Sequence, residues 1–219
     1  MSRILYNLWG NRRDIWHTDI QSKYKIELKN ASDGTVFVNT DFVDIANQET
    51  VRKNLNRLVQ TGVLKRVLNG VYEKPKYSKL LGEYIAADPD AVAKALARSY
   101  HWTIAPCGNA ALNLLGLSTQ VPVVYSYVSD GPYKIYELGS TKIEFKHRTN
   151  KEISGLSYTT SLVVQALKAL GKSNISSDVI QILGNNLSKE NKQACLKEAK
   201  ETTSWVYSTI QNICRDNAQ

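Results

Sequence analysis

Residues 47–73 read NQETVRKNLNRLVQTGVLKRVLNGVYE, and this stretch decides the fold of the N-terminal part of the chain. Asn47 predicts the start of a helix, because its side chain can accept a hydrogen bond from a free backbone N–H group of the first turn. Gly62 predicts the end of that helix after residue 60, and the Asn69-Gly70 dipeptide between two apolar runs predicts a two-residue hairpin. We therefore expect a helix followed at once by a hairpin.

The residues before this stretch predict the remaining elements of a winged helix-turn-helix. Apolar side chains recur every fourth residue over 20–28, which indicates one face of a helix, and the β-branched run 35–38 indicates a short strand. A short helix is expected over 41–46, and its close spacing to the next helix is typical of a helix-turn-helix. We predict a winged helix-turn-helix DNA-binding domain over residues 20–76. Residues 1–19 show no sustained period and form an unassigned N-terminal extension.

The helix predicted at 48–60 has one apolar face and one polar, cationic face. Val51, Leu55 and Leu58 share the apolar face at about 100° per residue, which turns amide and cationic side chains outward. Such side chains match the base-edge acceptors of the DNA major groove, while cations of the wing can meet phosphates. The residues predicted to contact DNA are Thr40, Gln48, Glu49, Thr50, Arg52, Lys53, Asn56, Arg57, Lys65, Arg66 and Asn69.

The positive charge of the chain is concentrated in the same stretch. The net charge is +8, and residues 50–76 hold seven Lys or Arg against the single carboxylate of Glu73, so this stretch carries six of the eight excess positive charges. A local cationic patch favours a polyanionic partner such as double-stranded DNA. Two interpretations without DNA stay open, namely a solvated helix beside a hairpin, and a winged helix used for protein contacts.

The remaining residues predict a second domain of α+β type that ends in a helical cluster. Residues 77–84 look like a connector with a short helix, and a helical period covers 194–213. Strand-like runs lie at 121–128, 134–138 and 142–147. We assign an α+β domain to 77–155 and the helical C-terminal part of the same domain to 156–219. The predicted fold class of the whole chain is α+β.

Composition argues against several other classes of protein. No window reaches the roughly 18 consecutive apolar residues of a membrane span, and the N-terminus lacks the apolar core of a signal peptide, so we expect a cytoplasmic protein without a membrane partner. The three cysteines lie far apart and the three histidines lack ligand spacing, so neither a metal site nor a cofactor is predicted. An enzyme using His101 and Cys107 would lose activity in Cys107→Ala; two ordinary, partly buried residues are the simpler interpretation, and no catalytic residue is predicted.

The wing and a run in the middle of the chain carry a family resemblance. Gly70-Val71-Tyr72 is followed by PCGNAALN at 106–113 and by LGLSTQVP at 115–122. These residues resemble the AbiEi-like antitoxins of type IV toxin–antitoxin systems, in the branch that begins with a winged helix-turn-helix. The likeness extends from about Tyr24 to Trp205, and the second run is its most specific part.

The resemblance implies a bacterial antitoxin that represses its own promoter and counteracts a nucleotidyltransferase-like toxin, directly or functionally. The partner surface would then include Asn109, Asn113, Ser118, Thr119 and Gln120. The alternative is a plain winged-helix transcriptional regulator whose second domain dimerises or senses a ligand, and a gene neighbourhood without a toxin would favour it. Because one wing and one short helix bury limited surface, we expect a homodimer or two molecules on an inverted repeat.

Overall fold

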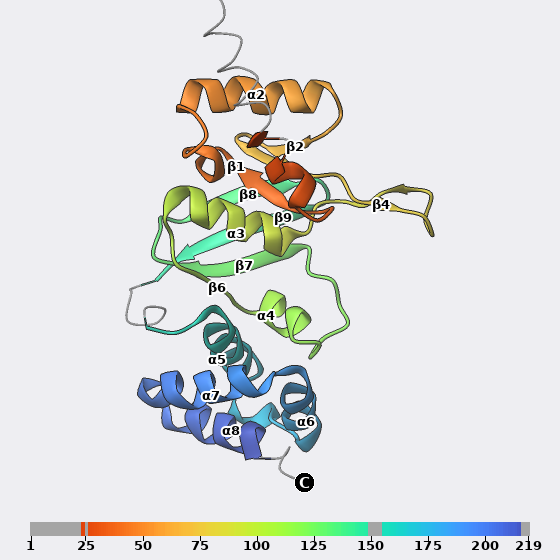
Figure 1. Cartoon of the computed structure of the whole chain (residues 1–219). Coiled ribbons are helices and arrows are strands. Elements are labelled where there is room, and N and C mark those ends of the chain that lie inside the picture. Colours follow the sequence, from red (N-terminus) through yellow and green to blue (C-terminus); the bar gives the residue numbers. More distant parts are fainter. Residues whose placement is uncertain (1–22, 25, 149–154, 216–219) are drawn as a thin grey trace, which may run out of the picture. The chain divides into compact units, whose positions relative to one another are not determined.

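A computed structural model describes residues 23–24, 26–148 and 155–215 (Figure 1). The fold is of mixed α+β type with a helical cluster at the C-terminal end, as the sequence predicts. The chain divides into two compact units, one ending at Ser99 and the other beginning at Tyr100. The N-terminal extension proposed for residues 1–19 lies outside the described residues. No helix of the described part is long and apolar enough to cross a membrane.

The first unit contains a small antiparallel sheet with helices packed around it. Residues 23–24 and 26–30 are helical. The elements that follow are β1 (Val36–Val38), the 3-10 helix η1 (Asn39–Phe42), α2 (Gln48–Gln60), β2 (Lys65–Leu68) and β3 (Val71–Glu73). Strand β3 lies between β1 and β2, and both pairings are antiparallel. The helix predicted at 48–60 and the hairpin that follows it are therefore confirmed.

The short α-helix predicted over 41–46 is wrong. A single 3-10 turn occupies its place, and the backbone N–H groups of Ile45 and Ala46 both bond to the carbonyl of Phe42 without starting a regular helix. The carboxylate of Asp41 accepts a hydrogen bond of 2.9 Å from the backbone N–H of Val38, the last residue of β1. Because strand and turn are joined so closely, only one turn of helix fits before Asn47 caps α2.

The connector predicted to contain a short helix at 77–84 is instead a two-stranded hairpin. Its strands are β4 (Tyr77–Ser78) and β5 (Glu83–Tyr84), and the rings of Tyr77 and Tyr84 meet edge to face. Gly82 supplies the positive φ of +69° that the turn requires. This turn geometry and the cross-strand pair of aromatic rings favour a hairpin over a helix.

Helix α3 (Pro89–Tyr100) belongs to the first unit up to Ser99, whereas the sequence analysis places the domain boundary between residues 76 and 77. The guanidinium group of Arg98 explains the later division. It donates hydrogen bonds of 3.3 and 3.0 Å to the two carboxylate oxygens of Asp41 and one of 3.2 Å to the carbonyl of Val36. A bidentate contact of this kind ties α3 to β1 and η1.

The core of the first unit is small and partly aromatic. Phe42 packs against Tyr24 and Phe37, with ring centres 5.0 and 5.6 Å apart. Val51 and Leu55 of α2 are completely buried against this cluster. The apolar face predicted for α2 therefore packs inward, which fixes the direction of the opposite, polar face.

The second unit begins with a mixed four-stranded sheet. Its elements are β6 (Ile104–Pro106), α4 (Asn109–Leu114), β7 (Val124–Ser129), β8 (Lys134–Leu138) and β9 (Thr141–His147). The strand order is β6-β7-β9-β8, in which β7 and β9 are parallel and the other pairs antiparallel. The central strands bury Tyr127 and Phe145 completely.

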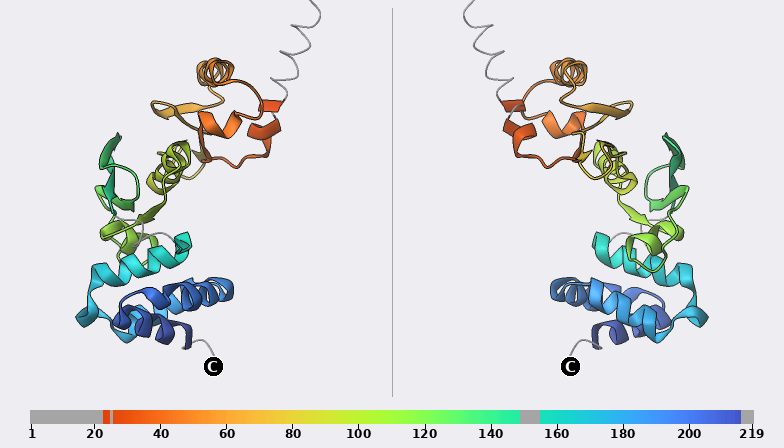
Figure 2. Two further views of the ribbon diagram at one scale, coloured as in Figure 1. Left: turned by 90° about the vertical axis from the view of Figure 1, so that its left-hand side faces the viewer. Right: turned by 90° about the vertical axis from the view of Figure 1, so that its right-hand side faces the viewer.

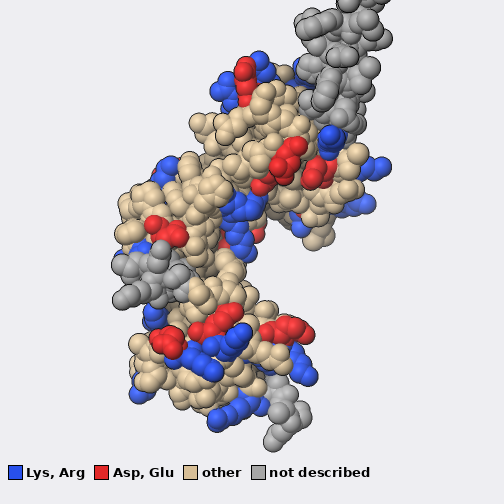
Figure 3. Space-filling view, turned by 60° about the vertical axis from the view of Figure 1, so that its left-hand side comes forward, with Lys and Arg blue, Asp and Glu red and all other residues tan. Residues whose placement is uncertain are grey.

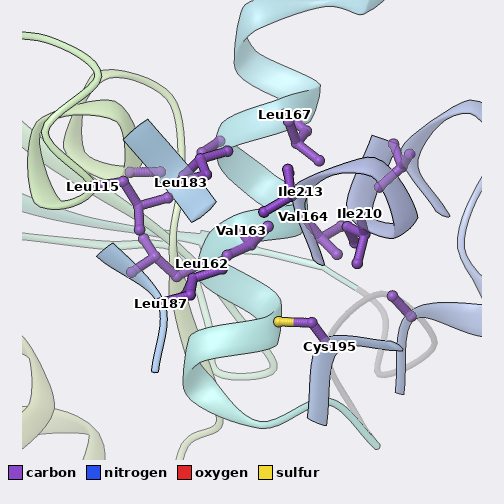
Figure 4. Packing of buried hydrophobic residues seen from close by; sticks show 14 residues of the cluster. Leu115, Leu162, Val163, Val164, Leu167, Leu183, Leu187, Cys195, Ile210 and Ile213 are labelled. Atoms are coloured by element: carbon purple, nitrogen blue, oxygen red, sulfur yellow. The ribbon is translucent and has the colours of Figure 1, made fainter. Parts of the chain in front are cut away.

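Four helices complete the second unit and lie together in both views of Figure 2. They are α5 (Tyr158–Leu170), α6 (Ser177–Asn186), α7 (Lys189–Glu198) and α8 (Ser204–Arg215), with the 3-10 turns η3 (Lys172–Asn174) and η4 (Ala199–Glu201) between them. Figure 4 shows Val164 and Leu167 of α5 facing Ile210 and Ile213 of α8. The helical period predicted over 194–213 is interrupted, because Thr202 is extended and its hydroxyl caps the carbonyl of Ala199.

Candidate nucleic-acid interface

Helix α2 presents the polar face that the sequence predicts. Asn47 caps it, because the side-chain oxygen accepts a hydrogen bond of 3.0 Å from the backbone N–H of Thr50, which is partly buried in the first turn. Val51 and Leu55 are buried on the opposite side. The exposed residues of α2 include Gln48, Glu49, Arg52, Lys53 and Arg57.

The charges on this face are only partly neutralised within the chain. Lys53 Nζ lies 2.7 Å from Glu49 Oε1, one turn earlier, and this hydrogen bond with its charge lowers the pKa of Glu49. Both side chains are well exposed, so their pair contributes little to stability. Arg52 and Arg57 form no salt bridge with any carboxylate in the described ranges. Their charges remain available to a polyanion.

The hairpin of β2 and β3 adds cations beside α2. Gly70 has a φ of +75°, which a glycine adopts without steric cost, and this conformation closes the loop between Leu68 and Val71. Asn69 is exposed at the tip, and Lys65 and Arg66 are exposed on β2. In Figure 3, the end of the first unit where α2 lies carries blue Lys and Arg side chains with a smaller red acidic patch among them.

Arg66 connects the hairpin to α2. Its Nη2 donates a hydrogen bond to the side-chain oxygen of Asn56. The guanidinium carbon also lies 5.7 Å from the centre of the Tyr72 ring, within the range of a cation–π contact. Asn56 and Arg66 come from different elements, and the sequence does not predict a contact between them. The structure shows that a change in either side chain alters the surroundings of the other.

Glu73, the single carboxylate within the cationic stretch, is buried. Its residue is 2% exposed, and its Oε2 has no hydrogen-bond partner in the described part of the protein. Burial raises the pKa of Glu73, while the charge of Lys65, its neighbour across the strand pair, acts to lower it. The carboxyl group of Glu73 therefore reduces the positive charge of this surface less than its position in the sequence suggests.

A groove of about 450 Å³ lies at the N-terminal end of α2. It is lined by four residues predicted to contact DNA, namely Thr40, Gln48, Glu49 and Arg52, and also by Asn39 and Ser99. The side-chain oxygen of Asn39 is buried there without a hydrogen-bond partner in the described chain. Asn39 is not among the residues predicted from the sequence, although an amide directly before Thr40 was a signal for it.

The residues predicted to contact a protein partner lie on α4 and the loop that follows it. Asn113 Nδ2 donates hydrogen bonds to the carbonyl oxygens of Ser118 and Gln120, at 3.4 and 3.0 Å, and so closes this loop. The hydroxyl of Ser118 accepts a hydrogen bond from the backbone N–H of Gln120. Asn109, Thr119 and Gln120 are exposed. The set therefore divides into two loop-closing side chains and three exposed ones.

Two valines extend the exposed part of this loop. Val121 and Val123 are 72% and 67% exposed, although the sequence analysis placed them in a strand over 121–128. The strand β7 begins only at Val124, because Pro122 lacks the N–H group that a ladder needs. Exposed apolar side chains next to polar ones are typical of a protein contact surface.

The structure bears on two alternatives, a nucleophilic cysteine and a metal site. Burial raises the pKa of the Cys107 thiol, whereas a nucleophilic cysteine needs a lowered pKa. His101 lies in an exposed turn with a φ of +56°. Within the described residues, no three His, Cys, Asp or Glu side chains are grouped so that they could hold a metal ion.

Comparison with known proteins places the chain in one family. The family model DUF6088, a family of unknown function, matches residues 23–195. The chain belongs to this family. No curated protein matches it. Among solved structures, the crystal structure of the Rv2827c protein from Mycobacterium tuberculosis is similar to 91% of this chain and 76% of that chain, with 13% sequence identity and a TM-score of 0.40.

The DUF6088 match includes both candidate surfaces. It begins in the first described helical residues, covers α2 with its hairpin and the loop after α4, and ends within α7. The family model therefore covers parts of both units.

Proposed function

We propose that the first unit is a winged helix-turn-helix that binds double-stranded DNA, with α2 in the major groove and the β2–β3 hairpin as the wing. The exposed polar face of α2 carries this proposal, because Arg52 and Arg57 stand there without a salt bridge to any described carboxylate, opposite the buried Val51 and Leu55. A helix of this kind fits the groove, and amides and cations match its base-edge acceptors.

The contacts divide between bases and phosphates. The exposed Lys53 and the partly buried Asn56 lie near the middle of the polar face and would read base edges. Lys65, Arg66 and Asn69 on the hairpin would meet phosphates, which position the protein without reading sequence. The hydrogen bond from Arg66 to Asn56 supports a common orientation of helix and wing.

We further propose that the protein represses its own promoter and acts as an antitoxin against a nucleotidyltransferase-like toxin in the cytoplasm. This part rests on the resemblance of the 106–122 region to AbiEi-like antitoxins. The exposed Val121 and Val123, beside the polar Thr119 and Gln120, support a protein-contacting loop in the second unit. A plain regulator whose second unit dimerises or senses a ligand is the competing function.

DNA binding is tested with the full chain and DNA from upstream of its own gene. The dissociation constant, measured by fluorescence anisotropy, should rise steeply with salt, because Lys and Arg displace counterions from phosphates. Arg52→Glu should weaken binding roughly 100-fold through the lost contact and the new repulsion. Lys142→Glu is the matched control, since that exposed lysine of β9 is already paired with Glu137 at 3.0 Å. Equal effects of both changes would contradict the proposed interface.

The antitoxin role is tested in cells that carry an inducible neighbouring toxin and a promoter reporter. Lys53→Ala combined with Arg57→Ala should abolish repression while the cells are still rescued. Val121→Glu combined with Val123→Glu should do the reverse, because two carboxylates replace exposed apolar contacts. If the first variant loses rescue together with repression at matched protein levels, the protein is a plain regulator.

A further inference from the structure

A second, apolar pocket lies in the first unit on the side of α2 away from the groove at its N-terminal end. Its volume is about 450 Å³, within the range of pockets that hold small molecules. Tyr24 and Leu28 line it from the N-terminal helical residues, Leu58 from α2, and Val63 from the segment after α2. Most of the wall is therefore apolar, and it is formed in part by the helix that we propose to enter DNA.

The polar groups of this pocket favour an anion. Lys29 and Arg57 stand at its rim, both exposed, and neither forms a salt bridge with a carboxylate in the ranges that the structure describes. None of the described residues that line the pocket is acidic. A ligand with a negative group would therefore gain two positive partners. The carboxylate of Asp33 lies near the wall, but it is paired with the lining residue Lys74 at 3.2 Å.

The buried hydroxyl group of Tyr24, in the pocket wall, also favours an anionic ligand. Tyr24 is 2% exposed, and its hydroxyl has no hydrogen bond of normal geometry within the described residues, although Asn54 lies close enough to influence it. Burial raises the pKa of Tyr24, and the Asn54 side chain acts to lower it. Buried polar groups are normally satisfied, so an unsatisfied donor in a pocket wall indicates a missing acceptor.

We propose that this pocket binds a small amphipathic anion, with an apolar body between Leu28, Leu58 and Val63 and a carboxylate, sulfonate or phosphate group at Lys29 and Arg57. Together with the proposed function, this makes the ligand a regulator of DNA binding. Arg57 belongs both to the pocket rim and to the exposed face of α2, so an anion that holds its guanidinium group competes with DNA for it.

Binding is tested first without DNA, by titrating the full chain with anilinonaphthalene sulfonate, an apolar anion that fluoresces in dry pockets. Saturable binding of one probe per chain is expected. Val63→Glu should weaken it at least roughly tenfold, because it adds a carboxylate inside the pocket at an exposed, fold-tolerant position. The matched control is Leu80→Glu, on the 94% exposed tip residue of the β4–β5 hairpin, which should leave binding unchanged.

Three results would overturn the site: an absence of saturable binding, an equal loss in Leu80→Glu, or equally tight binding of the uncharged phenylnaphthylamine. The regulatory part is then tested by anisotropy on promoter DNA, where saturating probe should raise the dissociation constant roughly tenfold in the unmodified chain and not in Val63→Glu. An unchanged dissociation constant for DNA at saturating probe would overturn the proposed regulation. A chain that binds probe and no DNA would overturn the proposed function and leave the pocket established.

Discussion

Two lysines of the four-stranded sheet differ from the arginines of α2 in having a carboxylate beside them. In the sheet, Lys142 pairs with Glu137 at 3.0 Å and Lys146 with Glu144 at 3.2 Å. On α2, Arg52 and Arg57 form no such pair among the described residues, and only Lys53 is matched. Lysine and arginine side chains in these two places therefore differ in how far their charge is neutralised. Paired cations are neutralised within the sheet, whereas unpaired ones keep a field that can attract a polyanion.

The two units also differ in the core that supports these surfaces. The first unit packs α2 on a small cluster with several aromatic rings, and the second packs a larger aliphatic cluster between helices. An exposed cationic face needs a rigid support, because a loose helix would pay ordering entropy on binding. Under the proposed function, loss of this small core should therefore lower the affinity for DNA.

The largest expected effect separates these two cores. Leu55→Ala in α2 and Leu167→Ala in α5 each remove a completely buried side chain and should each cost about 2–5 kcal/mol in the free energy of unfolding. Only Leu55→Ala should also weaken DNA binding, because every predicted DNA contact lies in the first unit. Thermal unfolding and DNA anisotropy on the same samples check this. If Leu167→Ala weakens DNA binding equally, the contrast between the units fails.

A smaller effect tests whether the wing and α2 act together. Asn56→Ala and Arg66→Ala should each weaken promoter binding, and the double variant should lose less than the sum by roughly 1 kcal/mol, because the two side chains share a hydrogen bond. The control cycle pairs Arg66→Ala with Lys53→Ala, whose partner is Glu49. That cycle should be additive within about 0.5 kcal/mol. Coupling energies of equal size in both cycles would show that the hydrogen bond between Asn56 and Arg66 is not the cause of the coupling.

Much of the first unit follows from local signals in the sequence. Asn47 and Gly62 mark the two ends of α2, and Asn69-Gly70 marks the hairpin, because caps and turns depend on the residue itself and its nearest neighbours. The turn at η1 could not be predicted this way. It depends on Asp41 and on the distant Arg98, whose contact forms only after the chain has folded.

The candidate sites were predictable where they lie on one helix and not where they combine elements. The exposed face of α2 follows from its period, whereas the bond between Asn56 and Arg66 and the burial of Glu73 depend on how the hairpin folds against α2. The exposed Val121 was missed because an apolar run with valines resembles a strand. The signal against a strand at this position was Pro122, which has no backbone N–H group to donate to a neighbouring strand.

Two carboxyl groups, those of Glu73 on β3 and Glu144 on β9, have opposite surroundings. Burial raises the pKa of Glu73, whose Oε2 has no hydrogen-bond partner among the described residues. Burial also acts to raise the pKa of Glu144, but hydrogen bonds with Ser126, Lys146 and Tyr133 lower it overall. The folded state therefore favours the protonated form of Glu73 and the ionised form of Glu144.

The smallest expected effects follow from this difference and should have opposite signs. A raised pKa in the folded state means that Glu73 costs stability at pH values above its unfolded pKa, so Glu73→Gln should raise the melting temperature at neutral pH, with a gain that shrinks as the pH falls through the raised pKa and is absent below the unfolded one. A lowered pKa means that Glu144 stabilises the fold above its unfolded pKa, so Glu144→Gln should lower the melting temperature at neutral pH, and this loss should fade as the pH falls through the lowered pKa. Melting curves of both variants and the unmodified chain, taken from acid to neutral pH, check the signs. Shifts of the same sign at neutral pH would mean that Glu73 finds a charge partner in solution, and the buried carboxyl would then count against the cationic patch after all.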